Sequence, residues 1–267
     1  FFMVCAFRIH SPCKIIVDKM LTNIDSIKTM KFHLKAIERC NGKLIFSESQ
    51  VKLKRFPLKI YLYLKGPELL WIEGENENNV LVNPNGFPFM NMNISCMNSF
   101  LRKNQHHTVK EVGYDYFREI IGETMKITGN NSDTYFKCQG EVEWEKHACH
   151  LIIADYPGFT YKDYVVKKGE TLTTIAHWLH VNDYMLLELN SAKVSYYDDV
   201  KEGQIIKVPN VYCNKIILYV DKKLLLPRVI KVYDEKGLFE MYQYHDLLIN
   251  SKIADEEFTK DYKGYEF

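Results

Sequence analysis

The sequence lacks several features that would assign a function class directly. No apolar run approaches the roughly 20 residues that a bilayer-spanning helix needs. The 35 basic and 34 acidic side chains leave a formal charge of +1. Such a balance gives no electrostatic reason to expect a nucleic acid or an anionic membrane surface as partner. With 46% hydrophobic residues, the composition is that of an ordinary globular protein.

A dense disulfide framework is also not expected. The seven cysteines form no CxxC pair, and their number is odd. Cys138 and Cys149 could face each other across a hairpin in an oxidising compartment. The pairing depends on geometry that a sequence does not contain, so it stays open here.

Catalytic signatures are missing as well. There is no GxSxG, no HExxH and no phosphate-binding glycine loop. On an alternating strand, His147 and Cys149 share one face and His150 points away, so zinc would need further ligands from elsewhere. The pair His106–His107 is interpreted as a solvated lead-in to a helix. Alternating carboxylates are interpreted as a solvated strand face: Glu141, Glu143 and Glu145. We therefore predict no catalytic residue, no metal ligand and no cofactor.

What is present is a change of hydrophobic period along the first half of the chain. Apolar residues between positions 14 and 24 have helical spacing and predict a short leading helix. Alternation of period two then predicts strands at 30–36, 51–53, 58–64, 68–73 and 80–82, separated by turn residues. A helix is predicted to begin at Thr108 as N-cap and to carry Val112, Tyr116, Ile120 and Ile121.

Strand patterns resume beyond that helix. They fall at 134–138, 142–144, 148–153, 215–220, 228–233 and 238–244. Near the end, Asp255 is predicted to cap a short helical turn at 258–262. Short strands in close succession indicate an α+β fold with an antiparallel meander.

The segment between the last two groups of strands carries the most specific pattern. Tyr164, Val166 and Gly169 lead into a helix that Thr171 can cap. A second helix follows and ends at Asn190, and a tight turn leads into a final strand. Sixteen positions match the hallmark of the LysM family, which the segment closely resembles: Tyr164, Val166, Gly169, Glu170, Thr171, Leu172, Ile175, Ala176, Leu186, Leu189, Asn190, Gly203, Gln204, Ile206, Val208 and Pro209.

This resemblance implies a small βααβ domain over residues 161–210 that binds GlcNAc-containing glycans such as peptidoglycan. The implied groove lies between two loops, formed by Gly169, Glu170, Thr171 and Leu172 on one side and Asn190, Ser191, Ala192 and Lys193 on the other. Many members of the family have proline after the asparagine, whereas Ser191 stands here. Most motif residues also build the core of the module, so the motif speaks more strongly for the fold than for affinity.

The chain around this segment carries a second resemblance. Leu226-Pro227 followed by a strand, then Tyr242-x-Tyr244-x-Asp246-Leu247, Asn250 and the ending Tyr265-x-Phe267, is similar to the LolA/LolB superfamily of lipoprotein carriers. That family implies a curved antiparallel half-barrel whose apolar face is covered by helices and receives an acyl chain. The alternating strands could line such a face with Leu58, Ile60, Leu62, Leu70, Ile72, Val80 and Val82, or the same residues could fill a closed core.

Together the patterns predict a discontinuous half-barrel domain at 14–158 and 211–267, with the LysM domain inserted. Residues 1–13, which begin with seven apolar residues followed by Arg8, are interpreted as the remnant of a signal peptide, with a first strand or helix as the alternative. We expect a periplasmic, non-enzymatic protein that binds peptidoglycan and a lipid or lipoprotein acyl chain. The alternatives are a structural cell-wall adaptor with a filled core and a wall-remodelling enzyme. The identity of the lipid, the form of the glycan and the oligomeric state are left open.

Overall fold

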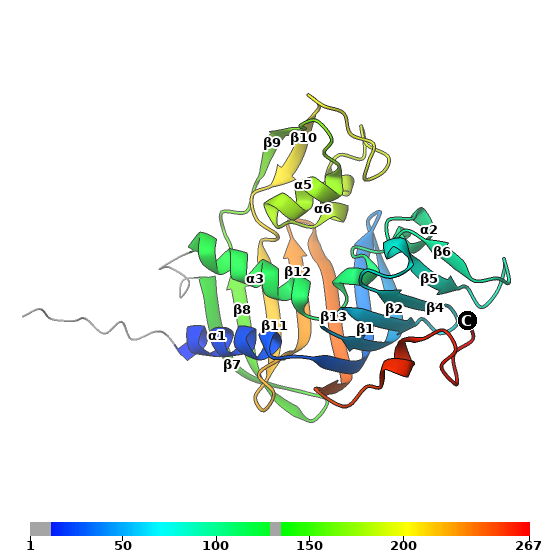
Figure 1. Ribbon diagram of the computed structural model, residues 1–267. Coiled ribbons are helices and arrows are strands. Elements are labelled where there is room, and N and C mark those ends of the chain that lie inside the picture. Colours follow the sequence, from blue (N-terminus) through cyan, green and yellow to red (C-terminus); the bar gives the residue numbers. More distant parts are fainter. Residues whose placement is uncertain (1–11, 129–134) are drawn as a thin grey trace, which may run out of the picture.

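The computed structural model describes residues 12–128 and 135–267, and its main feature is one large antiparallel sheet (Figure 1). Eleven strands of the described chain are hydrogen-bonded in the order β6-β5-β4-β3-β2-β1-β13-β12-β11-β8-β7. Their bounds are β1 Thr29–Cys40, β2 Lys43–Lys54, β3 Lys59–Tyr63, β4 Glu68–Ile72, β5 Val80–Asn83, β6 Met92–Ile94, β7 Phe136–Trp144, β8 His147–Asp155, β11 Lys215–Asp221, β12 Pro227–Asp234 and β13 Gly237–Ile249.

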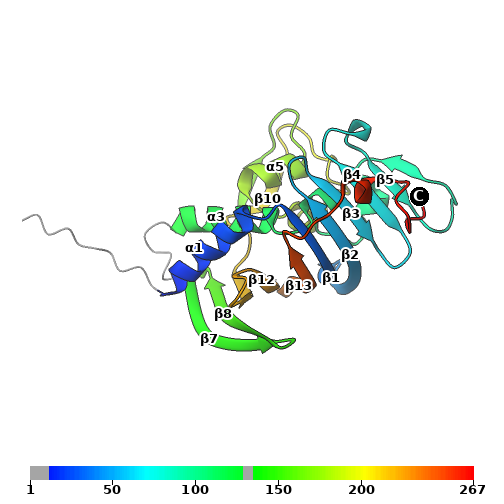
Figure 2. The same cartoon turned by 60° about the horizontal axis from the view of Figure 1, so that its bottom comes forward.

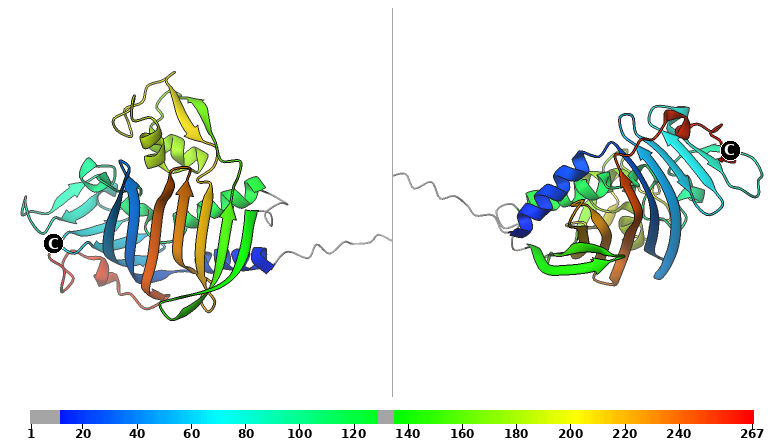
Figure 3. Two further views of the ribbon diagram at one scale, coloured as in Figure 1. Left: turned by 180° about the vertical axis from the view of Figure 1, so that it is seen from behind. Right: turned by 90° about the horizontal axis from the view of Figure 1, so that it is seen from below.

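Helices cover one face of this sheet. Helix α1 (Pro12–Asp25) and helix α3 (Asp115–Thr128) lie across it, and the sheet curves around them (Figures 2 and 3). Apolar residues at alternate strand positions, among them Met30, Leu53 and Val232, point toward the helices and form the main core. The expected α+β architecture, a curved antiparallel sheet with covering helices, is confirmed.

Short helical elements link the strands and the two long helices. They are η1 (Asn76–Asn78), α2 (Ser99–Arg102), η2 (Val109–Glu111) and η4 (Asp255–Phe258). The prediction that Asp255 caps a turn at 258–262 was wrong: Asp255 is the first residue of η4, which ends at Phe258, and Ala254 occupies the cap position.

The opposite face of the sheet is partly covered too. Tyr61 and Leu70 pair across β3 and β4 and pack there against Ile253 and Phe258 of the C-terminal segment. Leu70 and Ile72 therefore face away from the helices, and their expected place in the apolar lining was wrong. Because both faces of β4 are covered, Leu69, Leu70 and Trp71 are all buried, and no polar alternation marks which face is which.

The helix expected from Thr108 is divided in two. Thr108 caps only the short turn η2, and α3 begins at Asp115. Between them Gly113 has a φ of +101°, which favours glycine. A Cβ at this position would lie 3.1 Å from Leu53 Cδ1, and the Gly113 carbonyl accepts a hydrogen bond of 2.9 Å from Tyr244 Oη. The break thus places the connecting segment directly against the sheet.

A second, smaller unit connects two neighbouring strands of the main sheet, β8 and β11. It contains β9 (Tyr161–Val165), α5 (Leu172–Leu179), α6 (Asp183–Leu189) and β10 (Ile205–Pro209), and β9 pairs with β10 alone. Thr171 caps α5 by accepting a hydrogen bond from Thr174 N. The unit has its own core around Leu172, Leu186 and Val208. The expected βααβ order is therefore confirmed.

The structure also tests three further predictions. Cys138 pairs with Ile152 and Cys149 with Val142, because the register shifts between Cys138 and Glu141, so these two cysteines do not face each other as suggested. Glu141, Glu143 and Glu145 are exposed, as expected. The described chain holds no helix with the length and hydropathy to cross a membrane. Residues 1–11 of the segment interpreted as a signal remnant, and Thr134 of an expected strand, lie outside the described residues.

Candidate functional site

A cavity of about 310 Å³ lies between the curved sheet and the segment that runs from α2 into α3. Most of its walls are apolar: Leu34, Ala36, Leu62, Leu64, Leu69, Leu101, Val109, Val112, Phe117, Ile120, Ile216, Ile230 and Val232. Small-molecule sites are typically concave, mainly apolar spaces of about this size, with a few polar groups that fix orientation. The space therefore suits a ligand with a hydrocarbon part.

Small side chains in the middle of the sheet create this space. Ala36 on β1 is paired with Ser47 on β2, and Leu34 is paired with Ser49. All four line the cavity. Larger apolar residues at these positions would fill the room between sheet and cover, as they do elsewhere in the core. The cavity is thus a property of this strand pair.

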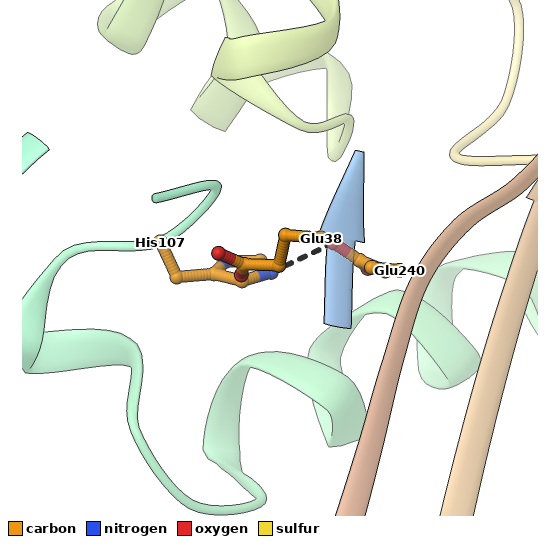
Figure 4. A group of neighbouring side chains, drawn as sticks. All are labelled: Glu38, His107 and Glu240. Atoms are coloured by element: carbon orange, nitrogen blue, oxygen red, sulfur yellow. Dashed lines mark hydrogen bonds and ion pairs between the residues drawn. The ribbon is translucent and has the colours of Figure 1, made fainter. Parts of the chain in front are cut away.

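One end of the cavity is polar and buried. Glu38 of β1 and Glu240 of β13 project from neighbouring strands toward His107, which precedes η2 (Figure 4). His107 Nε2 lies 3.2 Å from Glu240 Oε2. Tyr242 Oη donates a hydrogen bond of 2.6 Å to Glu38 Oε1, and Tyr212 Oη donates one of 2.7 Å to Glu240 Oε1. We call Glu38, His106, His107 and Glu240 the polar cluster.

His106 supports this cluster from behind and is completely buried. Its Nδ1 lies 3.0 Å from Glu240 Oε2, and its Nε2 lies 2.9 Å from the carbonyl oxygen of Arg39. A carboxylate and a carbonyl both accept, so both ring nitrogens must donate. His106 is therefore an imidazolium. His107, which was expected to be solvated, is also largely buried. The interpretation of the pair as a solvated lead-in to a helix was therefore wrong.

The charges within the cluster stabilise one another. Burial alone would lower the pKa of His106, but Cys40, Glu240 and Glu38 raise it to about 10. The pKa of His107 is likewise raised against burial, by the charge of Glu240 and a hydrogen bond to Glu111. Burial would raise the pKa of Glu240, but His107 and His106 hold it well below its usual range. Two imidazoliums thus face buried carboxylates at neutral pH.

The same residues include a donor set for a cation. Three possible ligand atoms, one from each of Glu38, His107 and Glu240, all lie within 4.8 Å of one another. A divalent metal would need the proton of His107 to leave, because an imidazolium has no free lone pair for it. The hydrogen bonds described above already satisfy both carboxylates, so the geometry favours a polar end of the cavity over a metal centre.

The smaller unit packs tightly onto the main sheet through α6. Asn182, the N-cap of α6, donates a hydrogen bond of 3.3 Å to Tyr212 Oη, which in turn donates to Glu240. Tyr184 stacks on His106 with 4.6 Å between ring centroids, and Tyr184 and Met185 belong to the main core. The smaller unit is consequently fixed to the wall of the cavity.

An ion pair strengthens this contact. Arg102 Nη2 of α2 lies 2.7 Å from Asp183 Oδ1 of α6, and both side chains are buried. Burial raises the pKa of Asp183 despite the charge of Arg102, whereas Asp183 raises the pKa of Arg102 despite burial. We regard the pair as ionised, because the 2.7 Å contact and a further hydrogen bond from Thr173 Oγ1 favour the carboxylate.

The expected glycan groove has both exposed and buried members. Gly169, Ser191, Ala192 and Lys193 are exposed and Glu170 and Thr171 are half-buried. Leu172 is fully buried in the core of the unit. Asn190 is buried, and its side chain bonds to the backbone of Leu186 and Lys207. These two side chains therefore hold the loops in place, and contact with a glycan would fall to the exposed members and the backbone.

The fold, the cavity and the expected glycan groove define an α+β protein. Helices cover one face of its curved sheet, a cavity lies under part of that cover, and a βααβ module is attached. Comparison with known families agrees. The chain belongs to the family described as protein of unknown function (DUF1571), whose model matches residues 27–171. It also contains a LysM domain, whose model matches residues 164–209. No catalytic family matches the chain, and no curated protein matches it.

Solved structures similar in fold have low sequence identity. A chain of the Pseudomonas aeruginosa MucA/MucB complex matches with a TM-score of 0.43 and 11% identity over 93% of this chain, which spans only 61% of that one. The Mycobacterium tuberculosis lipoprotein LppX matches with a TM-score of 0.42 and 10% identity, and the match covers 90% of this chain and 96% of LppX. A putative outer membrane lipoprotein-sorting protein domain from Vibrio parahaemolyticus matches with a TM-score of 0.30 and 9% identity, and the match covers 92% of this chain and 95% of that domain. These likenesses concern the fold alone and carry no argument about ligands.

The sequence did not reveal the polar cluster. His106 and His107 were noticed as a pair, but their partners lie far away in the sequence, 68 residues for Glu38 and 134 for Glu240. Glu38 and Glu240 do interrupt otherwise apolar strand faces, and such a buried acid next to apolar neighbours is the one signal that could have pointed to them.

Proposed function

We propose that this protein binds a ligand with a hydrocarbon chain in the cavity between the sheet and the segment from α2 into α3, and that it attaches to a GlcNAc-containing glycan, such as peptidoglycan, through its LysM domain. The division into a discontinuous sheet domain, 14–158 and 211–267, and an inserted domain at 161–210 is part of the proposal. A protein with both activities would work in the cell envelope, and we propose the periplasm. The expected ligands are a lipid or a lipoprotein acyl chain.

The observation that carries the proposal is the cavity itself. Its walls are apolar and the space is about 310 Å³, whereas a filled core would favour the purely structural adaptor. An apolar concave surface is a favourable place for a hydrocarbon chain, because binding removes the apolar surface of both from water. The polar cluster at one end would orient a ligand that has a polar head and an apolar tail.

Filling the cavity with a side chain tests the first part. Ala36 lines the cavity, and Ala36→Phe would occupy space that an acyl chain needs. We expect a fluorescent fatty acid, 11-(dansylamino)undecanoic acid, to bind the unmodified protein and to lose at least ten-fold in affinity with Ala36→Phe.

The matched control is Ala148→Phe, because Ala148 is an exposed alanine on strand β8. It should bind the probe as the unmodified protein does. Equal affinity in all three proteins would contradict a ligand in this cavity, and no binding to any of them would leave the adaptor as the better account.

The second part is tested at the groove. Ala192 is exposed in the second of the two groove loops and, unlike Asn190, holds no loop in place through its side chain. Ala192→Arg should therefore obstruct the groove without unfolding the module. We expect the unmodified protein to sediment with insoluble peptidoglycan and Ala192→Arg to remain mostly in solution, while Ala148→Arg sediments normally.

Point substitutions are preferable to removal of the module. Tyr184 and Met185 of α6 are part of the main core, so a deletion would expose the surface around Tyr212 and His106. If neither the unmodified protein nor Ala148→Arg sediments with peptidoglycan, glycan attachment is wrong and the LysM domain serves only as a scaffold.

A further inference from the structure

A second cavity, of about 350 Å³, lies where the LysM domain meets the main sheet. Thr174, His177 and Trp178 of α5 form one side, and His107, Glu111 and Tyr116 form the other. Hydroxyl, imidazole and carboxylate groups are present in this lining, and three of its members, His107, Glu111 and Tyr116, also line the first cavity.

Trp178 is the unusual member of this lining. Its side chain is 76% exposed, although tryptophan is among the largest apolar side chains. The buried face of α5 is formed instead by Leu172, Ile175 and Ala176. Trp178 therefore adds little to the core, and an indole held open on a helix offers a flat apolar surface with a donor at its edge.

The helix connects this surface with the glycan groove. Thr171, Thr174 and Trp178 are separated by three and four residues, so they follow one another along a single face of the helix. Thr171 belongs to the groove, and Trp178 lies about 10 Å further along the axis at roughly 1.5 Å per residue. A short oligosaccharide can span that distance, and the face is solvent-accessible along its length because Thr174, His177 and Trp178 are exposed.

We propose that the second cavity is a saccharide subsite that continues the LysM groove, with Trp178 stacking on the apolar face of a sugar ring. Thr174, His177 and Glu111 are placed to bond its hydroxyl or acetamido groups. The subsite is built by both domains and rests on the proposed glycan attachment. It explains why a large aromatic side chain stays exposed beside a hollow that contains hydroxyl, imidazole and carboxylate groups, which a role in folding does not.

Tryptophan fluorescence and calorimetry test this subsite with one probe, the β-1,4-linked tetramer of GlcNAc. The chain has three tryptophans. Trp71 is buried and Trp144 is only partly exposed, so Trp178 should dominate any response. We expect the emission of the unmodified protein to shift to shorter wavelength with saturation, and Trp144→Phe to give the same shift.

The decisive variant is Trp178→Ala, measured by titration calorimetry because the reporter is lost. Its affinity for the tetramer should fall at least ten-fold while its urea unfolding midpoint stays unchanged. If Trp178→Ala binds normally and Ala192→Arg does not, the subsite is wrong and the groove alone binds glycan. If the unmodified protein does not bind the tetramer, glycan attachment itself fails, and the subsite fails with it.

Discussion

Arg102 of α2 and Asp183 of α6 form a buried ion pair, with 2.7 Å between Nη2 and Oδ1, across the contact between the sheet domain and the LysM domain. Arg102 also lies over the ring of Tyr197, 4.4 Å from its centroid. The pair joins the LysM domain directly to the segment that covers the cavity.

Removing one partner of this pair should destabilise the whole chain. Asp183→Leu leaves the Arg102 charge buried without its carboxylate, and breaking a buried pair in this way costs about 3 kcal/mol of unfolding free energy or more. The double variant Arg102→Met with Asp183→Leu should recover much of that loss. Urea denaturation of both single variants and the double variant gives the coupling energy, and additive losses would contradict the pair's role.

The dependence of stability on pH should reflect the buried imidazoliums. The pKa of His106 rises from 6.5 to about 10 on folding, so its contribution is complete below pH 6.5 and is lost as pH rises toward 10. The slope is at most about 1.4 kcal/mol per pH unit for one proton. Glu240 acts with the opposite sign, because its pKa is lowered from 4.5 and its contribution is lost as pH falls below that value.

Unfolding midpoints in urea from about pH 4 to about pH 9.5 check this prediction. The unmodified protein should be most stable near about pH 5 to 6. His106→Gln keeps a neutral donor near Glu240 but takes up no proton, so its stability should decline less steeply above pH 6.5. Parallel curves for the two proteins would mean that His106 is neutral in the folded state.

Gly113 should tolerate no side chain. Its φ of +101° and the 3.1 Å distance that would separate an added Cβ from Leu53 Cδ1 both oppose alanine. We expect Gly113→Ala to lose about 1–3 kcal/mol of stability. Gly86→Ala is the control, because the nearest atom to its Cβ would be 3.9 Å away and its φ is ordinary. A similar loss in both variants would show that the break before α3 is not specific.

The hydroxyl of Tyr212 should matter more than that of a surface tyrosine. The Tyr212 hydroxyl donates to Glu240 Oε1 and accepts from Asn182 Nδ2, and Tyr212→Phe removes both hydrogen bonds. An unsatisfied buried group costs about 1–3 kcal/mol. Tyr219→Phe, which removes only a 3.4 Å contact from Lys231 Nζ, should change stability by less than about 0.5 kcal/mol. Equal effects would contradict the link from α6 to the polar cluster.

Much of the fold could be predicted from the sequence, because its signals are local. The leading helix, the alternating strands and the cap at Thr171 each depend on residues a few positions apart. The LysM pattern was readable for the same reason. Where both faces of a strand are covered, as around Leu69 and Leu70, the alternation disappears and the sequence could not tell which residue faces the helices.

The candidate sites were less predictable, because they depend on distant pairs. The cavity exists because Ala36 and Ser47 pair at the centre of the sheet, and short side chains in a strand carry no signal of an unfilled space. The burial of His106 depends on Glu38 and Glu240, and these contacts follow from the pairing of β1 with β13. The sequence pattern shows at most that Glu38 and Glu240 interrupt apolar strand faces, and it does not show that these two residues meet.

The proposed function requires that one chain carries an apolar ligand while it is attached to a glycan. The most direct measurement sediments insoluble peptidoglycan in the presence of 11-(dansylamino)undecanoic acid and the protein, and follows protein and probe in the pellet. We predict that the unmodified protein brings the probe down, that Ala36→Phe sediments without the probe, and that Ala192→Arg leaves both in solution. A pellet that contains the protein but never the probe, or an equal amount of probe with Ala36→Phe, would contradict the proposed function.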